Sequence, residues 1–474
     1  MPFTDLSEAG DQAYFADGVA EDILNALAKV RDLRVAGRTS SFAFKGVSAD
    51  IKTIGKQLNV ATVLEGSIRR FQNRVRITTQ LVDTSTGYHL WSETYDHETK
   101  DLFAIQDKRS RAVVKRLNIV LRSEEADRPL VEQKTDNPES YRLYLQGRYM
   151  WKRRYGDNLP QAIRLFEQAL AYDPDFARGH SALAAAYAIL PTFTRADLAE
   201  SYEAAERAAY MALQLNPELS EPQAVLGRLY SGRLQWRRAE QQFQRAISMQ
   251  PEDGVARLWY GLHSLSTGRL QHALAQFENV LSTDPAWGIP VYLHSEVLYA
   301  LGQREAAIQG AKRAIALDTY YGHMLLGDIT YEQGQFDQTI RHVIEFMRLI
   351  GASEPRINKR RMSLEASLGV NDTQSAFLQK TEAQLKAGNI SPRVAFYRFY
   401  YAKRIDQAIE LFDLRAHPAL YRFLRKTWGP LGRPLRRHPK FSAIAADLGL
   451  IDFWHEFGWP DRCRPDAAHG VQCD

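Results

Sequence analysis

The chain has 474 residues, of which 45% are apolar and 11% aromatic, and its 61 Lys and Arg outnumber its 56 Asp and Glu for a net charge of +5. This length exceeds one compact core and predicts two or three domains or one extended array, while the apolar content excludes a disordered chain. No uncharged apolar run approaches the length of a membrane-spanning helix, and the amino terminus lacks a basic and apolar leader. We therefore expect no membrane span and no export signal in this chain.

The amino-terminal part, residues 1–60, combines two helical patterns with one strand pattern. Apolar residues at helical spacing mark the face of a first helix: Val19, Ile23, Leu27 and Val30. The stretch LRVAGR, residues 33–38, is typical of a short buried strand. A second helix, begun by Ser48 or Asp50, carries Ile51, Ile54 and Leu58 on one face.

Strand patterns dominate residues 61–96. ATVLEGSIRRF and RVRITTQLVDT alternate around Gln72-Asn73 and predict a hairpin, and YHLWSETYD predicts a third strand after a further turn. Residues 102–121 then show a helical pattern. The order α-β-α-β-β-β-α predicts an α/β sandwich, one sheet with helices on it, over residues 1–121. Met1-Pro2-Phe3 is interpreted as the tail of another strand whose beginning is missing.

Three carboxylates, Asp17, Glu21 and Asp22, cluster near the start of the first predicted helix. Carboxylates at that end interact favourably with the helix dipole, so we interpret them as capping residues. A metal site is the alternative interpretation.

The middle of the chain is repetitive. Prolines that follow an acidic or amide residue close successive helical patterns, and the last three of them are evenly spaced: Pro138, Pro174, Pro217, Pro251 and Pro285. A period of about 34 residues, built from two amphipathic helices with small residues where they approach and an aromatic between them, is typical of tetratricopeptide repeats. The stretch 221–254 shows this pattern most fully, with Leu226-Gly227, Tyr230, Ala239, Phe243 and Ala246.

Six such repeats fit residues 137–351, the first and last imperfectly, and predict an all-α solenoid after a linker at 122–136. Helical patterns in 373–387 and 391–414 are interpreted as capping units within a C-terminal region, residues 352–474. An ordinary helical bundle explains any single repeat equally well. Several repeats in register favour the solenoid.

First helices of tetratricopeptide repeats line a concave groove that suits extended or helical peptides. The register of residues 221–254 places the following candidates there: Arg228, Tyr292, Glu296, Tyr299, Tyr321, Met324, Asp328 and Tyr331. The acids and tyrosines favour a peptide with aromatic or apolar anchors and a basic residue. Packing between repeats is the alternative role for each tyrosine.

The carboxy-terminal quarter, residues 351–474, has a net charge of +7, with 20 Lys and Arg against 13 Asp and Glu. Residues 421–440 are rich in Arg and Lys, contain no acid and include Trp428. Nucleic acid is one ligand for such a run, but no recognition helix accompanies it, so we interpret it as a solvated or partner-facing patch and expect no direct nucleic-acid binding. Lys359-Arg360-Arg361 is interpreted in the same way.

The chain has two cysteines, Cys463 and Cys473. With His455 and His469 they do not repeat the paired spacing of common zinc modules. A disulfide that closes a short loop and two free thiols both remain open.

Several segments resemble a known family: PFTDLSEAGDQAYFADGVAEDILNALAKV, VLEGSIRR, RVRITTQLVDTSTGYHLWSETYD and LFAIQD. They resemble the TolB-like amino-terminal domain of bacterial proteins that continue into tetratricopeptide repeats, and HPKFSAIAADLGLIDFWHEFGWPDRC resembles their closing segment. The resemblance implies an output module in front, either a class III adenylate or guanylate cyclase domain or a winged-helix domain. PF at position 2 indicates a truncated chain or a stand-alone relative.

No catalytic constellation accompanies these patterns. The chain has no G-x-x-x-x-G-K-[ST] loop, no G-x-S-x-G elbow and no segment that matches the paired aspartates of a cyclase. We therefore predict a non-enzymatic, cofactor-free module that binds a protein or peptide, as the sensing or scaffolding part of a bacterial signalling system. The regulatory portion of a nucleotide cyclase and that of a winged-helix transcription regulator are the alternatives. We expect a soluble, cytoplasmic protein, or a periplasmic one if a membrane span precedes it.

Overall fold

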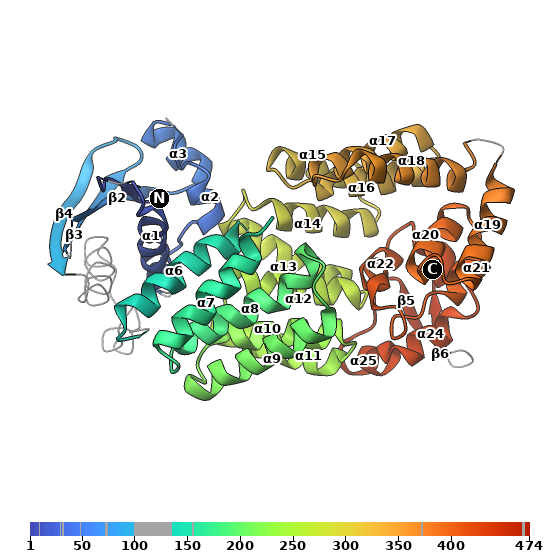
Figure 1. The fold of residues 1–474 in the computed structure, drawn as a ribbon. Coiled ribbons are helices and arrows are strands. Elements are labelled where there is room, and N and C mark those ends of the chain that lie inside the picture. The colour runs from blue at the N-terminus through green and yellow to red at the C-terminus, as the bar shows by residue number, and fades with distance from the viewer. Residues whose placement is uncertain are drawn as a thin grey trace. The chain divides into compact units, whose positions relative to one another are not determined.

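The computed structural model describes residues 1–474 except 9, 29, 31–32, 48, 72–73, 99–134, 154–155, 371–372 and 467–469. The described residues are mostly helical, with one small sheet near the amino terminus and a short hairpin at the carboxyl end (Figure 1). They form two compact units. The first comprises residues 1–229, 241–256 and 282–286, and the second comprises residues 230–240, 257–281 and 287–474.

The amino-terminal sheet of the first unit has the strand order β1-β2-β3-β4. Its strands are β1 (Thr4–Asp5), β2 (Thr62–Phe71), β3 (Arg74–Asp83) and β4 (His89–Glu98). β2, β3 and β4 are antiparallel, as the alternating patterns predict, whereas β1 pairs in parallel with β2. Alternating burial along β3 gives the sheet one inner face, which includes Val75, Ile77 and Leu81.

Helices α1 (Ala13–Ala28), α2 (Arg38–Phe42) and α3 (Ile51–Leu58) accompany this sheet. The predicted apolar face of α1 is correct, since Val19, Ile23 and Leu27 are buried. α3 begins as predicted at Asp50, whose carboxylate accepts a hydrogen bond from the Thr53 amide. The predicted helix at 102–121 lies outside the described residues.

The strand predicted at residues 33–38 is wrong. Residues 33–37 have no regular structure, and Arg38 already belongs to α2. The Gly37 amide donates to the Thr283 carbonyl at 2.6 Å, and the Asp284 carboxylate accepts from the amides of Thr39 and Ser40. The Gly37 amide is therefore paired with a distant connection instead of a neighbouring strand, and the Asp284 carboxylate satisfies two amides in the first turn of α2.

Four helices of the first unit form the first two helical pairs of the repeat region: α6 (Pro138–Lys152), α7 (Asn158–Tyr172), α8 (Ala177–Phe193) and α9 (Leu198–Leu215). Asn137 caps α6, because its side chain accepts from two amides of the first turn, and Pro138 follows at the first helical position. Ala162, Phe166 and Ala169 are fully buried where α6 and α7 pack. The register predicted for this repeat is therefore correct.

The repeats continue through α10 (Ser220–Gly232), α11 (Trp236–Met249), α12 (Gly254–Ser266) and α13 (Leu270–Thr283), which contribute residues to both units. Ala239 and Phe243 are fully buried, as the repeat register predicts. A methyl group on Gly227 would lie 2.9 Å from the Phe243 ring, and one on Gly261 would lie 2.4 Å from the Phe277 ring. Glycine in this position therefore lets the aromatic side chain fit between two helices.

We expect Gly261→Ala to lower the free energy of unfolding by about 1–3 kcal/mol, because the added methyl group overpacks the Phe277 ring. Gly327 is the matched control, since it occupies the corresponding position two repeats later. There the facing side chain is Val343 and an added methyl group finds its nearest atoms at 3.6 Å. Gly327→Ala should be neutral or stabilising by about 0.5–1 kcal/mol. Urea unfolding of both variants tests this, and equal effects would contradict it.

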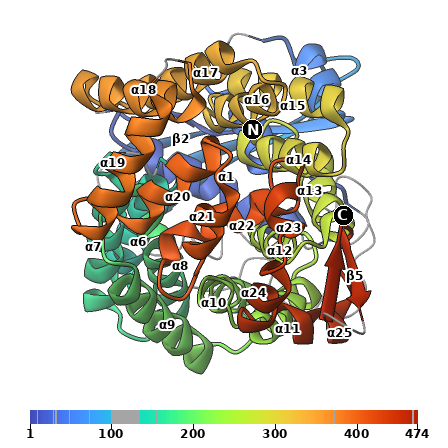
Figure 2. The ribbon, with the colours of Figure 1, turned by 90° about the vertical axis from the view of Figure 1, so that its right-hand side faces the viewer.

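The second unit continues with five helices of the repeat region and its end: α14 (Gly288–Ala300), α15 (Arg304–Ala316), α16 (Tyr321–Glu332), α17 (Phe336–Leu349) and α18 (Glu354–Leu368). After them come α19 (Gln374–Lys386), α20 (Pro392–Tyr401) and α21 (Ile405–Glu410), which lie within the helical patterns predicted at 373–387 and 391–414, the second of which is divided into two helices. The last residues form short elements: η2 (Pro418–Leu420), α22 (Tyr421–Thr427), α23 (Arg433–Arg436), α24 (Phe441–Asp447), α25 (Leu450–Phe457), β5 (Cys463–Asp466) and β6 (Gly470–Cys473) (Figure 2). We call residues 418–474 the C-terminal segment.

Candidate functional site

The first helices of two consecutive repeats, α14 and α16, carry most of the residues predicted to contact a partner. We define the α14–α16 face by Tyr292, Glu296, Tyr299, Asp328 and Tyr331. These residues follow one another at intervals of three and four, which brings them to one side of each helix. All five are buried. Within the second unit, the C-terminal segment contacts Glu296 and Asp328, and α20 contacts Tyr331.

Two ion pairs join this face to α22. Arg425 Nη1 lies 3.4 Å from Glu296 Oε2, and Lys426 Nζ pairs with the Asp328 carboxylate. The four side chains are at most 16% exposed. Burial alone would lower the pKa of Lys426, but the facing Asp328 carboxylate outweighs burial and raises that pKa above its ordinary value. The acids therefore hold basic side chains, the chemistry expected of their partner.

Aromatic contacts surround the ion pairs. Tyr292 packs on Tyr321 with ring centroids 5.6 Å apart, and Tyr321 also packs on Phe346 at 5.3 Å. Tyr331 meets the edge of Tyr401, on α20, at 5.1 Å. The Tyr299 hydroxyl is buried and finds no hydrogen-bond acceptor or donor among the described residues. Burial raises the pKa of Tyr299 well above its ordinary value.

Two predicted residues stand apart from this face. Arg228 belongs to the first unit, where its guanidinium donates to the Ala188 carbonyl at 3.2 Å. Met324 is half-buried on α16. The sequence register thus brings six of the eight candidates, all on α14 and α16, into one aromatic and acidic cluster. It gives no sign that the chain itself covers them.

The C-terminal segment is anchored to the second unit by tryptophan indoles. Trp428 donates to the Ser266 carbonyl at 3.0 Å and Trp454 donates to the Thr267 carbonyl at 2.8 Å, both at the end of α12. Trp236, at the start of α11, donates to the Leu448 carbonyl at 2.7 Å. Each indole is buried, so each of these hydrogen bonds satisfies a donor that water cannot reach.

The same segment also closes helix ends. The Asp461 carboxylate accepts from the Leu270 amide at 2.5 Å, at the amino end of α13. The Arg462 guanidinium donates to the Ala300 carbonyl at 2.7 Å, at the carboxyl end of α14. The surface-patch interpretation of the basic run is therefore wrong for part of it, because Arg425 and Lys426 pair with buried acids and Arg436 is buried against the carbonyls of its own segment.

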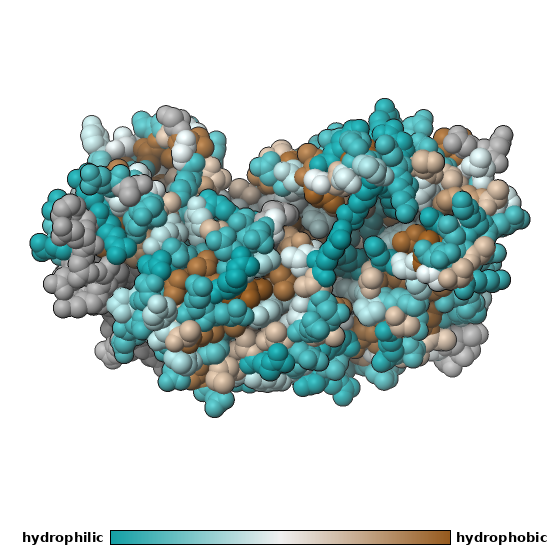
Figure 3. All heavy atoms as spheres, in the orientation of Figure 1, coloured by the Kyte–Doolittle hydropathy of each residue, from teal (hydrophilic) through white to brown (hydrophobic). Residues whose placement is uncertain are grey.

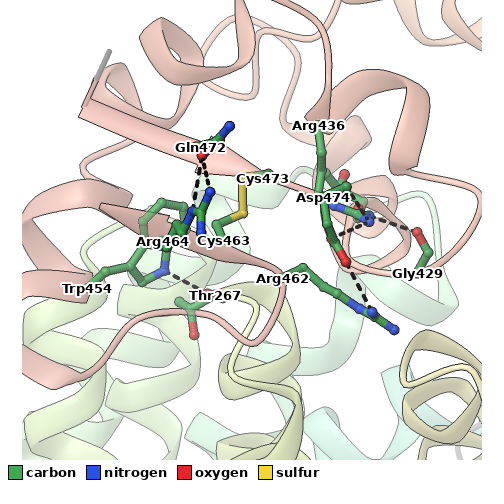
Figure 4. Close-up of a disulfide and its surroundings, with 11 residues drawn as sticks. Thr267, Gly429, Arg436, Trp454, Arg462, Cys463, Arg464, Gln472, Cys473 and Asp474 are labelled. Carbon is green, nitrogen blue, oxygen red and sulfur yellow. Dashed lines mark hydrogen bonds and ion pairs between the residues drawn. A yellow bond between two sulfur atoms is a disulfide. The ribbon is translucent and has the colours of Figure 1, made fainter. Parts of the chain in front are cut away.

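A cystine joins the two strands at the carboxyl end. The structure links Cys463 and Cys473, which face each other in the β5–β6 ladder (Figure 4). Figure 4 shows Arg436 and Arg462 both directed at Asp474, to which they donate at 3.3 Å and 3.2 Å. The last residue is thus held by two guanidinium groups beside the cystine.

A buried polar cluster in the second unit was not foreseen from the sequence. Glu240, on α11, accepts a hydrogen bond from the Tyr260 hydroxyl at 2.5 Å and pairs with Arg269 and with His263 at 3.2 Å. Burial would raise the pKa of Glu240, but the His263 and Arg269 contacts lower it to about 2. The only sequence signal was a charged residue next to the buried Ala239 of the repeat.

The acidic residues of α1 are side-chain partners rather than caps. α1 begins at Ala13, so Asp17, Glu21 and Asp22 lie beyond its first turn. Asp17 pairs with Lys45, Glu21 pairs with Arg38 and Lys152, and Asp22 accepts from the Tyr141 hydroxyl. The capping interpretation is therefore wrong. Two of these partners come from α6, which packs on α1.

The face drawn in Figure 3 is mainly hydrophilic, and its apolar residues form small, separate patches. In the part of the chain that the structure describes, no helix is both long and apolar enough to span a bilayer.

Part of the repeat region matches a known protein family. Residues 225–286 match the tetratricopeptide repeat family. Two solved structures are similar at low identity. A tetratricopeptide repeat protein from Parabacteroides merdae is 18% identical, covering 55% of this chain and 91% of that one with a TM-score of 0.36. PilF of Pseudomonas aeruginosa is 18% identical, covering 45% and 93% with a TM-score of 0.34.

One curated relative is similar in sequence. It is the putative adenylate cyclase 3 of Rhizobium meliloti, 41% identical over 183 residues. The match covers 39% of this chain and 31% of that protein, so it leaves most of the relative unmatched.

Proposed function

We propose that this chain is a non-enzymatic interaction module whose repeats bind a protein or peptide partner through their first helices. Tetratricopeptide repeat proteins generally mediate protein–protein interaction, and residues 225–286, which precede α14, match that family. The observation that carries the proposal is the α14–α16 face, where Glu296 and Asp328 hold a basic pair flanked by tyrosines. A segment with adjacent basic residues and an aromatic anchor is the ligand chemistry that this face fits.

The segment that satisfies this chemistry here belongs to the chain itself. Residues 421–428 present Arg425 and Lys426 to the two acids, and Trp428 follows in a fully buried position. An external partner of the same chemistry must therefore compete with α22. Such competition makes partner binding conditional on release of the C-terminal segment, which is a regulatory property.

A labelled peptide with the sequence of residues 418–430 tests this binding chemistry. We expect the wild-type chain to bind it weakly, because α22 is in place. A chain with Arg425→Ala and Lys426→Ala should bind it at least ten-fold more tightly, as measured by fluorescence anisotropy. Circular dichroism must first show that this chain is folded, and Arg425→Ala alone replaces the double variant if it is not.

The peptide controls separate recognition from general charge. A peptide with alanine in place of Arg425 and Lys426 should lose binding, whereas one with alanine in place of Arg422 should keep it, because Arg422 is exposed. Equal binding of all three peptides to the folded variant would contradict the proposal.

The relative's name favours one setting for this module. The similarity to a putative adenylate cyclase supports a role as the regulatory portion of a nucleotide cyclase system. We also propose that the amino-terminal sheet with α1 and α3 is a TolB-like α/β domain, a proposal supported by the strand order and by the resemblance of residues 1–118.

A further inference from the structure

A second cluster of functional side chains lies where α16, α17 and α18 pack together. It surrounds a cavity of about 340 Å³ whose lining includes His323, His342, Arg341, Arg348, Arg361 and Glu345. Ile340 and Ile344 add an apolar wall. Nothing in the repeat architecture requires three arginines and two histidines around one hollow, because the repeats are held by the apolar contacts described above.

The charges of this cavity are unbalanced. Arg348 pairs with Glu345 at 3.5 Å, which is the one ion pair among these lining residues, all of which the structure describes. The Arg361 Nε atom is buried and has no hydrogen-bond partner within the described part of the chain. An unpaired buried donor on a cation is costly unless an acceptor reaches it. The cavity therefore has at least one guanidinium more than its carboxylate can satisfy.

The two histidines contact each other across the helix pair. His323 Nδ1 lies 3.1 Å from His342 Nδ1, so one ring carries its proton on Nδ1 and the other keeps an N–H on Nε2. Burial lowers the pKa of both rings, and for His342 the neighbouring His323 and Arg341 lower it further. Both rings are neutral near pH 7, and only the ring with the Nε2–H can donate to an anion. A nearby negative charge favours protonation of either ring.

We propose that this cavity is a binding site for a doubly charged oxyanion, such as inorganic sulfate or the phosphate monoester group of a small molecule. Guanidinium groups match the oxygen spacing of such anions and bind them in a bidentate manner. Two charges suit the site better than one, because the arginines outnumber the single carboxylate. The same excess of positive charge disfavours a metal cation beside the histidines.

Isothermal titration of the full chain with sulfate, inorganic phosphate, pyrophosphate and acetate at constant ionic strength tests the site. Sulfate is the decisive probe because its charge is fixed across the pH range used. We expect sulfate to bind at least ten-fold more tightly than acetate, and more tightly at pH 6 than at pH 8, because protonation of His323 or His342 adds positive charge. Equal affinities for sulfate and acetate would overturn the proposal.

Variants locate the site. Arg361→Gln should weaken sulfate binding at least ten-fold, and so should Arg341→Gln. Because Arg341 is exposed, its substitution should not affect folding. Arg356→Gln is the matched control, because Arg356 is an exposed arginine of the same helix, α18, that does not line the cavity. Sulfate binding that all three variants retain, or that Arg356→Gln weakens equally, would overturn the assignment. Tighter pyrophosphate than phosphate binding would indicate a diphosphate-bearing ligand of this class.

Discussion

Replacing Lys426 by methionine is expected to lower the free energy of unfolding by about 3–5 kcal/mol, because it leaves the Asp328 carboxylate buried without a countercharge. The matched control is Lys440→Met. Lys440 pairs with Glu410 in an ion pair whose two side chains are both more than half exposed, so its loss should cost less than about 1 kcal/mol. Urea unfolding measured by circular dichroism compares the two variants.

A double variant separates the charge from the packing. Combining Lys426→Met with Asp328→Leu removes both charges, and apolar side chains of similar volume can replace a buried ion pair at little cost. We therefore expect the double variant to recover most of the free energy of unfolding that Lys426→Met loses. If Lys426→Met instead unfolds like Lys440→Met, the contact between α22 and the α14–α16 face does not hold the C-terminal segment in place.

The second large effect is expected for Glu240→Gln, which should lower the free energy of unfolding by about 3–5 kcal/mol at pH 7. The substitution keeps the size of the side chain but removes the charge that faces Arg269 and His263. Glu252→Gln is the control, because Glu252 is an exposed acid in the turn that follows α11. Equal unfolding free energies for these two variants would exclude a stabilising role for the cluster.

The same residue predicts a pH dependence. The folded-state pKa of Glu240 is lowered to about 2 from an ordinary value of 4.5. A lowered pKa in the folded state means that the stabilisation is fully present above about pH 4.5 and is lost as the pH falls toward 2. The pKa difference corresponds to about 3 kcal/mol. The difference in the free energy of unfolding between wild type and Glu240→Gln should therefore decrease below pH 4.5. A difference that stays constant down to pH 3 would contradict this assignment of the pKa.

Much of the repeat architecture follows from local sequence patterns. The spacing of Gly227, Ala239 and Phe243 predicts two helices in contact, because only a small residue lets an aromatic ring lie between them. The antiparallel strands β2 to β4 follow from the alternation of apolar and polar residues, because successive side chains of a strand point to opposite faces of the sheet. Residues 33–37 could not be assigned in this way, since the backbone partner of Gly37, the Thr283 carbonyl, lies far away in the sequence.

Local patterns predict the helical pairs, the antiparallel strands and the acidic and aromatic composition of α14 and α16, because these depend on residues two, three, four or sixteen positions apart. What those residues contact depends on the tertiary structure. Glu296 and Asp328 meet Arg425 and Lys426 from more than 90 positions away, and Glu240, on α11, meets His263 on α12 and Arg269 just before α13. The separations of such pairs along the chain follow no regular spacing, because their charges are brought together by tertiary folding and not by the geometry of one helix or strand.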